Sequence, residues 1–154
     1  MALALILAAT LFALAGIHLY WGFGGRWPGH DEASMVEHVV GRTRGMRAPG
    51  FLASVAVALA LAAGGVLVLA SLTPTAWDGP LKAARWLLFA VFAGRGLATY
   101  VPPVFRYAED TPFVNLALVP EAASSWLLPA RIGHARAYGP LCLAIALGLL
   151  ILQL

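Results

Sequence analysis

The sequence predicts an all-α fold: an integral membrane four-helix bundle with short interfacial helices in its two long loops. The first observation is composition, because 61% of the 154 residues are hydrophobic and only 11% are charged, whereas a soluble domain carries about 25% charged residues. The second is that four segments are long and apolar enough to cross a bilayer, which takes roughly 20 mostly apolar residues. We therefore expect residues 1–154 to form a single membrane domain.

The four transmembrane helices are expected at about residues 1–23, 51–72, 81–101 and 134–154. Prolines mark several of their limits. Pro49 precedes the second helix, Pro74 follows it, and Pro102 ends the third, because a helix interior does not accommodate proline. The fourth helix is expected to start at about His134 or Tyr138, with Pro140 in its first turn, where the missing N–H is tolerated.

The first apolar segment leaves one alternative open. Ala13, Leu14 and Ala15 resemble a signal-peptidase site, so the segment could be a signal peptide. No basic residue precedes the apolar run, however, and the run continues beyond this site to Tyr20. These features favour a retained transmembrane helix.

Charge predicts the orientation of the bundle. Seven of the ten basic residues lie in or beside the two long loops, residues 24–50 and 102–133; we call the side of the membrane that carries them the long-loop side. Since cytoplasmic loops are enriched in Lys and Arg, the long-loop side is predicted to be cytoplasmic. We expect a multi-pass protein of the bacterial inner membrane with both termini outside.

The long loops themselves predict short helices. Residues 31–41 place Met35 and Val36 on one face and acidic residues elsewhere, which is typical of an amphipathic helix at a membrane surface. Residues 121–128 predict a second short helix, ended by Pro129.

Two ionisable residues, His18 and Arg95, fall inside the predicted spans, where such residues are costly and often functional. His18 has Trp21 three residues later on the same helix face. It is either a proton carrier or ligand contact, or a neutral histidine bonded to a neighbouring helix or to interfacial water. Arg95, between Gly94 and Gly96, either forms the positive floor of a pocket for an anionic headgroup or substrate, or snorkels to the interface.

Other polar and aromatic residues fall in the same half of the bilayer as this pair. In a compact bundle they would line one cavity open to the cytoplasm, whereas the opposite half is expected to offer only apolar and small residues. The candidate ligand-binding residues are His18, Trp21, Arg95, Thr99, Tyr100, Glu121, Tyr138 and Cys142.

Several classes of site lack their motifs. The lone Cys142 cannot form an intrachain disulfide, and the sequence contains no zinc spacing, P-loop, G-x-S-x-G or H-E-x-x-H motif. We expect no cofactor, no metal and no nucleic-acid partner. The catalytic status is left open.

Three functional interpretations follow. The leading one is a membrane protein that binds a membrane lipid or small amphiphile in the long-loop cavity. A second is a membrane enzyme acting on a lipid-soluble substrate, with His18 as acid and base and Arg95 stabilising negative charge. A third is a structural or assembly subunit, in a homo-oligomer or a larger membrane complex.

Three motifs recur in the order and spacing of a known group of sequences. They are HLYWGFGGRW at residues 18–27, RGL at 95–97 and YGPLCL at 138–143. The chain resembles a bacterial family of small four-helix membrane proteins, the domain-of-unknown-function 3995 family. The resemblance implies the four-helix membrane fold and supplies no activity. The recurring positions of that family correspond here to His18, Trp21, Arg95, Tyr138, Pro140 and Cys142.

Overall fold

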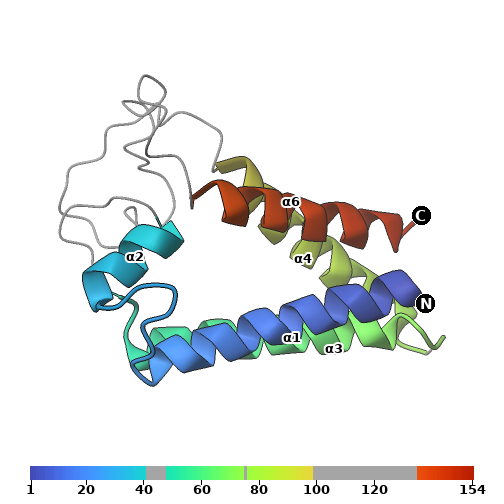
Figure 1. Cartoon of the computed structure of the whole chain (residues 1–154). Coiled ribbons are helices and arrows are strands. Elements are labelled where there is room, and N and C mark those ends of the chain that lie inside the picture. Colours follow the sequence, from blue (N-terminus) through green and yellow to red (C-terminus); the bar gives the residue numbers. More distant parts are fainter. Residues whose placement is uncertain (41–47, 75, 99–134) are drawn as a thin grey trace. The chain divides into compact units, whose positions relative to one another are not determined.

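The computed structural model describes residues 1–40, 48–74, 76–98 and 135–154, and these residues form helices and connections without any strand (Figure 1). An all-α fold is therefore confirmed for the described part of the chain. The helices are α1 (Ala2–Gly22), α2 (Glu32–Val40), α3 (Phe51–Ala70), α4 (Asp78–Ala98) and α6 (Ala135–Ile151).

The helix limits follow the apolar segments closely. α1 and α3 begin and end within two residues of the predicted limits, and α2 confirms the short helix predicted within residues 31–41. α4 starts three residues earlier than predicted, because Pro80 fits a first helical turn. Pro140 was expected in a first turn but lies inside α6, since that helix already begins at Ala135. The helix predicted at residues 121–128 lies outside the described residues.

Two reciprocal hydrogen bonds cap the N-terminus of α2. The backbone N–H of Ser34 donates to Asp31 Oδ1 over 2.7 Å, and the backbone N–H of Asp31 donates to Ser34 Oγ over 3.1 Å. This pairing satisfies N–H groups that a helix start otherwise leaves open. The hydrogen bonds from Ser34 also lower the pKa of Asp31. Met35 and Val36, on the predicted apolar face, are only 4% exposed.

The chain divides into two compact units. The first comprises Met1–Gly25, Pro49–Phe92 and Ala144–Leu154, and the second Arg26–Ala48 and Ala93–Leu143. The first unit thus contains α1, α3, most of α4 and the end of α6. The second contains α2, the last turns of α4 and the start of α6.

Within the first unit, α1 and α3 pack along their lengths in opposite directions. The start of α3 meets the end of α1, where Ser54 would lie 3.1 Å from a Cβ added to Gly22. The end of α3 meets the middle of α1, where the ring of Phe12 covers Gly65, with its Cζ 2.9 Å from an added Cβ. Small residues therefore allow the two backbones to approach closely, as helix pairs in membranes do.

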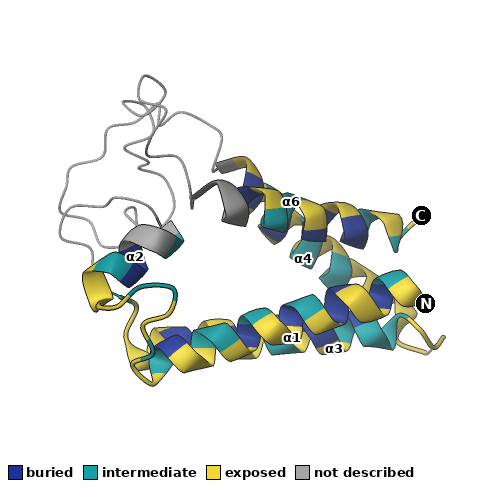
Figure 2. Ribbon diagram, viewed as in Figure 1, coloured by how far each residue is buried: buried dark blue, intermediate teal, exposed yellow. Residues whose placement is uncertain are grey.

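Glycines also bring the other two helices of the first unit into contact. Gly64 of α3 accommodates Leu88 of α4, whose Cδ1 would lie 3.3 Å from an added Cβ. Gly148 of α6 accommodates Leu7 of α1, whose Cδ2 would lie 2.9 Å from a Cβ added to Gly148. The residues that these contacts enclose are buried, and Figure 2 shows them as a dark stripe along α1 and α3.

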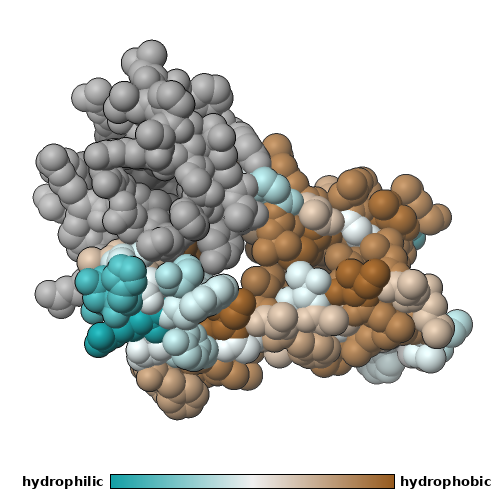
Figure 3. Space-filling view, in the orientation of Figure 1, coloured by the Kyte–Doolittle hydropathy of each residue, from teal (hydrophilic) through white to brown (hydrophobic). Residues whose placement is uncertain are grey.

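Most of the remaining surface of α1 and α3 is apolar and exposed. These two helices are long and apolar enough to cross a membrane, yet only 28% of each apolar stretch is buried within the chain. Figure 3 shows the resulting apolar surface in brown. Leu52 and Leu59 of α3, for example, are 81% and 66% exposed. The core helix of a soluble protein is usually buried over most of its apolar surface, and exposed apolar surface of this extent is typical of an interaction site.

Candidate functional site

His18 and Trp21 lie together near the end of α1. Their ring centroids are 5.1 Å apart, with 64° between the ring planes, an edge-to-face arrangement that is favourable for aromatic pairs. Trp21 is 8% exposed and His18 is half-buried. The three-residue spacing therefore places the two rings in contact, as one helix face predicts.

A hydrogen bond within α1 orients the His18 ring. Its Nδ1 lies 2.8 Å from the Leu14 carbonyl oxygen. A carbonyl only accepts, so Nδ1 carries the proton of this bond and donates it. Nε2 is then the ring nitrogen that can accept or take up a second proton. One expected alternative was a histidine that is hydrogen-bonded to a neighbouring helix. The bond to Leu14 is of another kind, because its acceptor lies one turn earlier in the same helix.

Arg95 and Cys142 lie together in the second unit. Arg95 is an exposed residue in the last turn of α4, where the helix dipole favours a positive charge. Its charge acts electrostatically on the half-buried Cys142 thiol of α6. The two predicted site residues directly flank the contact of Gly96 with Leu143, which brings this part of α4 and α6 together, although 47 positions separate them in the sequence.

Gly96 allows the close approach of α4 and α6 beside Arg95. A Cβ added to Gly96 would lie 2.7 Å from Leu143 Cγ and 3.1 Å from the Leu143 backbone nitrogen. Gly94, on the other side of Arg95, has no described residue within 4 Å of an added Cβ. Among the described residues, Gly96 is therefore the glycine beside Arg95 whose missing side chain allows the close contact with α6.

The remaining predicted site residues are not described. Thr99, Tyr100 and Glu121 lie outside the described residues, and the side chain of Tyr138 in α6 does too. The structure thus brings together two pairs, His18 with Trp21 and Arg95 with Cys142. One cavity that joins both pairs stays a prediction.

Sequence reasoning missed Ser54, which is the buried polar side chain of α3. It is 1% exposed, and its Oγ donates to the Pro49 carbonyl over 3.3 Å. The bond satisfies a carbonyl just before the helix, while the small side chain leaves room for Gly22 of α1. A serine among alanines and leucines was the signal in the sequence that could have indicated this position.

The expectation that the half opposite the long loops holds only apolar and small residues was wrong. Arg85 of α4 and Gln153 after α6 are only partly exposed, and Arg85 Nε and both amide atoms of Gln153 are buried. In the sequence analysis Arg85 was only one of the three basic residues outside the long loops, whose positions served to predict the orientation of the bundle. The burial of Arg85 Nε depends on how α4 packs against other helices, which the sequence does not show.

Over its described residues the chain is therefore an all-α protein, in which two helices are suited by length and composition to crossing a membrane. Residues 11–149 match the family described as "Protein of unknown function (DUF3995)", and the chain belongs to that family. This confirms the resemblance drawn from the three motifs. Neither the curated proteins nor the solved structures contain a match to the chain.

Proposed function

We propose that the protein is a four-helix inner-membrane protein that binds a lipid or small amphiphile on its long-loop side. The membrane assignment rests on the exposure of α1 and α3, because only 28% of the apolar stretch of each helix is buried within the chain. Burying such surface in lipid is favourable in proportion to its area, by about 25 cal/mol per Å². A monomer surrounded by water would not gain this free energy, because the apolar surface would stay exposed to water.

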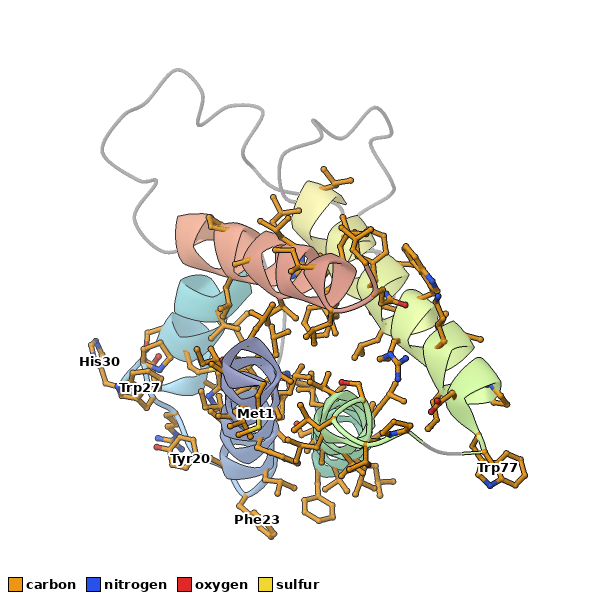
Figure 4. The ribbon with its side chains drawn as sticks, turned by 90° about the vertical axis from the view of Figure 1, so that its right-hand side faces the viewer. Met1, Tyr20, Phe23, Trp27, His30 and Trp77 are labelled. Atoms are coloured by element: carbon orange, nitrogen blue, oxygen red, sulfur yellow. The ribbon has the colours of Figure 1, made fainter. Side chains whose placement is uncertain are left out.

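Aromatic side chains support the membrane boundaries. At one end of the α1 and α3 pair the rings of Phe23 and Phe51 are in contact, with centroids 5.4 Å apart, and Phe23 is 77% exposed. Near the other end, in the connection from α3 to α4, Trp77 is 69% exposed. Figure 4 shows the Phe23 and Trp77 rings projecting away from the helices. Aromatic rings at both ends of a span of roughly 30 Å match the two interfaces of a bilayer.

The third and fourth spans are proposed for α4 and α6. α4 has 21 residues, which corresponds to a length of roughly 31 Å. Its charged residues lie in its first two turns and its last turn, and residues 86–94 between them are uncharged. Long basic side chains near the ends of a span can reach the interface. α6 is shorter, with an apolar stretch from Gly139 to Ile151.

Arg95 carries the ligand-binding part of the proposal. A charged residue within a span is costly and is retained where a partner or ligand offsets the cost. Arg95 is exposed beside Cys142 and next to the close contact of Gly96 with Leu143. In this proposal its guanidinium receives the anionic end of the amphiphile, and His18, Trp21 and Tyr138 shape the remainder of the cavity.

Mass spectrometry of small molecules that co-purify with the protein tests the ligand. The protein is extracted gently from membranes as wild type, Arg95→Ala and Lys82→Ala, where Lys82 is an exposed basic residue of the same helix. A species enriched on wild type and on Lys82→Ala but lost on Arg95→Ala is expected. Identical profiles for all three proteins, equal to the bulk membrane, would exclude a ligand on Arg95.

Labelling of single cysteines tests the membrane arrangement independently. In a Cys142→Ala background, cysteines replace Arg26 on the long-loop side and Gly79 in the first turn of α4, at the opposite end of the proposed spans; both positions are exposed. An impermeant maleimide added to intact spheroplasts is expected to label Gly79→Cys, and to label Arg26→Cys only after lysis. Labelling of both positions in intact cells would refute the proposed topology.

A further inference from the structure

The outer face of α3 lies opposite the contact of this helix with α1. Ser54 is buried on the inner face, beside Gly22 of α1. At about 100° per residue, Leu52 and Ala56 point roughly 160° away from Ser54, one to either side of the outward direction. Both of these residues are exposed. The outer face of α3 is thus open in the described part of the chain, and the proposed ligand site does not use it.

A row of large side chains runs along one half of this face. It consists of Leu52, Leu59 and Val66, which are 81%, 66% and 59% exposed. Their spacing of seven residues moves successive members by only roughly 20° around the helix, so the three side chains stay nearly in line. At 1.5 Å of rise per residue, this large row extends for roughly 21 Å along α3.

A row of alanines runs beside the large row on the same face. Its members are exposed and lie three or four residues apart: Ala53, Ala56, Ala60 and Ala63. Spacings of three and four residues keep side chains on one side of a helix. Because alanine ends at Cβ, a neighbouring helix can approach the backbone closely along this alanine row. The outer face is therefore raised along one half and low along the other.

The contacts within the chain show how large and small residues pair between its helices. Phe12 of α1 packs on Gly65, and Leu88 of α4 packs on Gly64. In each contact a large side chain of one helix occupies the space that a small residue leaves on another. The outer face of α3 presents both halves of such a contact, and both halves are exposed.

A second copy of the chain complements this face. Two copies inserted in the same orientation have parallel α3 helices, which a two-fold axis along the membrane normal relates to each other. Because this axis turns one helix by 180° onto the other, the large row of each copy faces the alanine row of the other at the same depth. Leu59 of one copy then lies at the level of Ala60 in the other. The face is therefore complementary to itself, which contact with lipid does not require.

We propose that the protein forms a homodimer in the membrane through the outer face of α3. Lipid chains are as apolar as leucine, so helix association in a membrane depends on close packing, which the two rows provide. α1 also exposes alanines, at Ala9 and Ala13, but Phe12 beside them already packs on Gly65 of α3. This inference rests on the membrane location proposed above, but not on the ligand site at Arg95.

Disulfide cross-linking in native membranes tests the interface. In a Cys142→Ala background, single cysteines replace Ala56, Ala63 or Val57, which are all exposed on α3. Val57 is the control, because it lies roughly 120° around the helix from Ala63. Oxidation is expected to link Ala56→Cys and Ala63→Cys into dimers, since a disulfide needs Cβ atoms about 4 Å apart, and to leave Val57→Cys monomeric. Equal cross-linking at Val57, or none at Ala56 and Ala63, would overturn this interface.

Analytical ultracentrifugation of the purified full-length protein, diluted in detergent, measures the dissociation constant of the dimer. Ala56→Leu fills the alanine row, and Leu59→Ala removes the centre of the large row. Ala13→Leu is the matched control, because Ala13 is an exposed alanine of α1. Ala56→Leu is expected to raise the dissociation constant at least about fivefold, the lower end of the cost of overpacking. Leu59→Ala is expected to raise it as well, and Ala13→Leu to leave it unchanged.

Circular dichroism verifies that each variant has the helical content of the wild type, and Leu59→Ala keeps the test open if Ala56→Leu does not fold. A wild type that stays monomeric at every concentration and in membranes would assign the face to lipid. Unchanged dissociation constants of both α3 variants, or an equal rise in Ala13→Leu, would also overturn the proposal. The maleimide labelling described above reports the membrane arrangement separately, so a monomer with the expected labelling would refute the dimer and not the topology.

Discussion

Two glycines of α4 allow a matched test of the contact between α4 and α6. Gly94 and Gly96 flank Arg95 in the same helix, and each is replaced by alanine. Alanine is favoured over glycine in a helix by roughly 0.5–1 kcal/mol, and this gain is common to both variants. The difference between the two variants therefore reports the packing around each added methyl group.

The structure predicts opposite results for the two substitutions. At Gly94 an added Cβ meets no described residue within 4 Å, so Gly94→Ala should stabilise the protein by about 0.5–1 kcal/mol. At Gly96 it would lie 2.7 Å from Leu143 Cγ and 3.1 Å from the Leu143 backbone nitrogen. Side-chain movement alone cannot relieve the second contact, and overpacking of this kind costs about 1–3 kcal/mol.

The assay is reversible unfolding in mixed micelles, followed by circular dichroism as the denaturing detergent is increased. Gly96→Ala is expected to be less stable than Gly94→Ala by about 1–3 kcal/mol in free energy of unfolding. The double variant Gly96→Ala with Leu143→Ala should recover part of this loss, because the smaller side chain gives up the closest contact. Equal stability of the two single variants would refute the close approach of α4 and α6 at Gly96.

Three further predictions concern α2, α3 and α1. Because hydrogen bonds from Ser34 lower the pKa of Asp31, the ionised carboxylate stabilises the start of α2 above the ordinary aspartate value of about 3.9. This stability should be lost as the pH falls through the lowered pKa of Asp31. Faster hydrogen exchange of the Ser34 backbone amide in acid would show the loss, and Asp31→Asn should abolish its pH dependence. Ser54→Ala should cost about 0.5–1.5 kcal/mol in free energy of unfolding through the lost bond to Pro49, and an unchanged stability would contradict a structural role for that bond. His18→Phe keeps the ring beside Trp21 but removes the bond to Leu14, so a loss of no more than about 1.5 kcal/mol is expected, and a collapse of folding would show that the histidine has a further partner.

Much of the helical architecture could be predicted from residue patterns. α1 and α3 follow from runs of about 20 apolar residues, since such runs satisfy their backbone groups internally as helices. α2 was predicted from the apolar face that carries Met35 and Val36, with the acidic residues elsewhere on the helix. The position of Pro140 was missed because nothing local to the proline shows how far a helix extends before it.

The candidate site could be predicted only in part. A three-residue spacing on one helix determined that His18 and Trp21 face the same way, so their contact could be expected from the sequence. The proximity of Arg95 to Cys142 joins residues of two helices, and sequence gives the depth of each along its helix but not the face that meets the neighbour. The burial of Ser54 and Arg85 was missed for the same reason.

The sequence by itself therefore determined the all-α fold class and the limits of α1, α2 and α3, because composition and periodicity act locally along the chain, and its three motifs determined the family. Only the tertiary structure decided that Gly96, and not Gly94, meets the neighbouring helix, and that Arg85 Nε and the Gln153 amide are buried. The physical reason is that burial and pairing depend on which faces of separate helices come together. That choice is made by close packing among all the helices at once and is not encoded in the spacing of any single one.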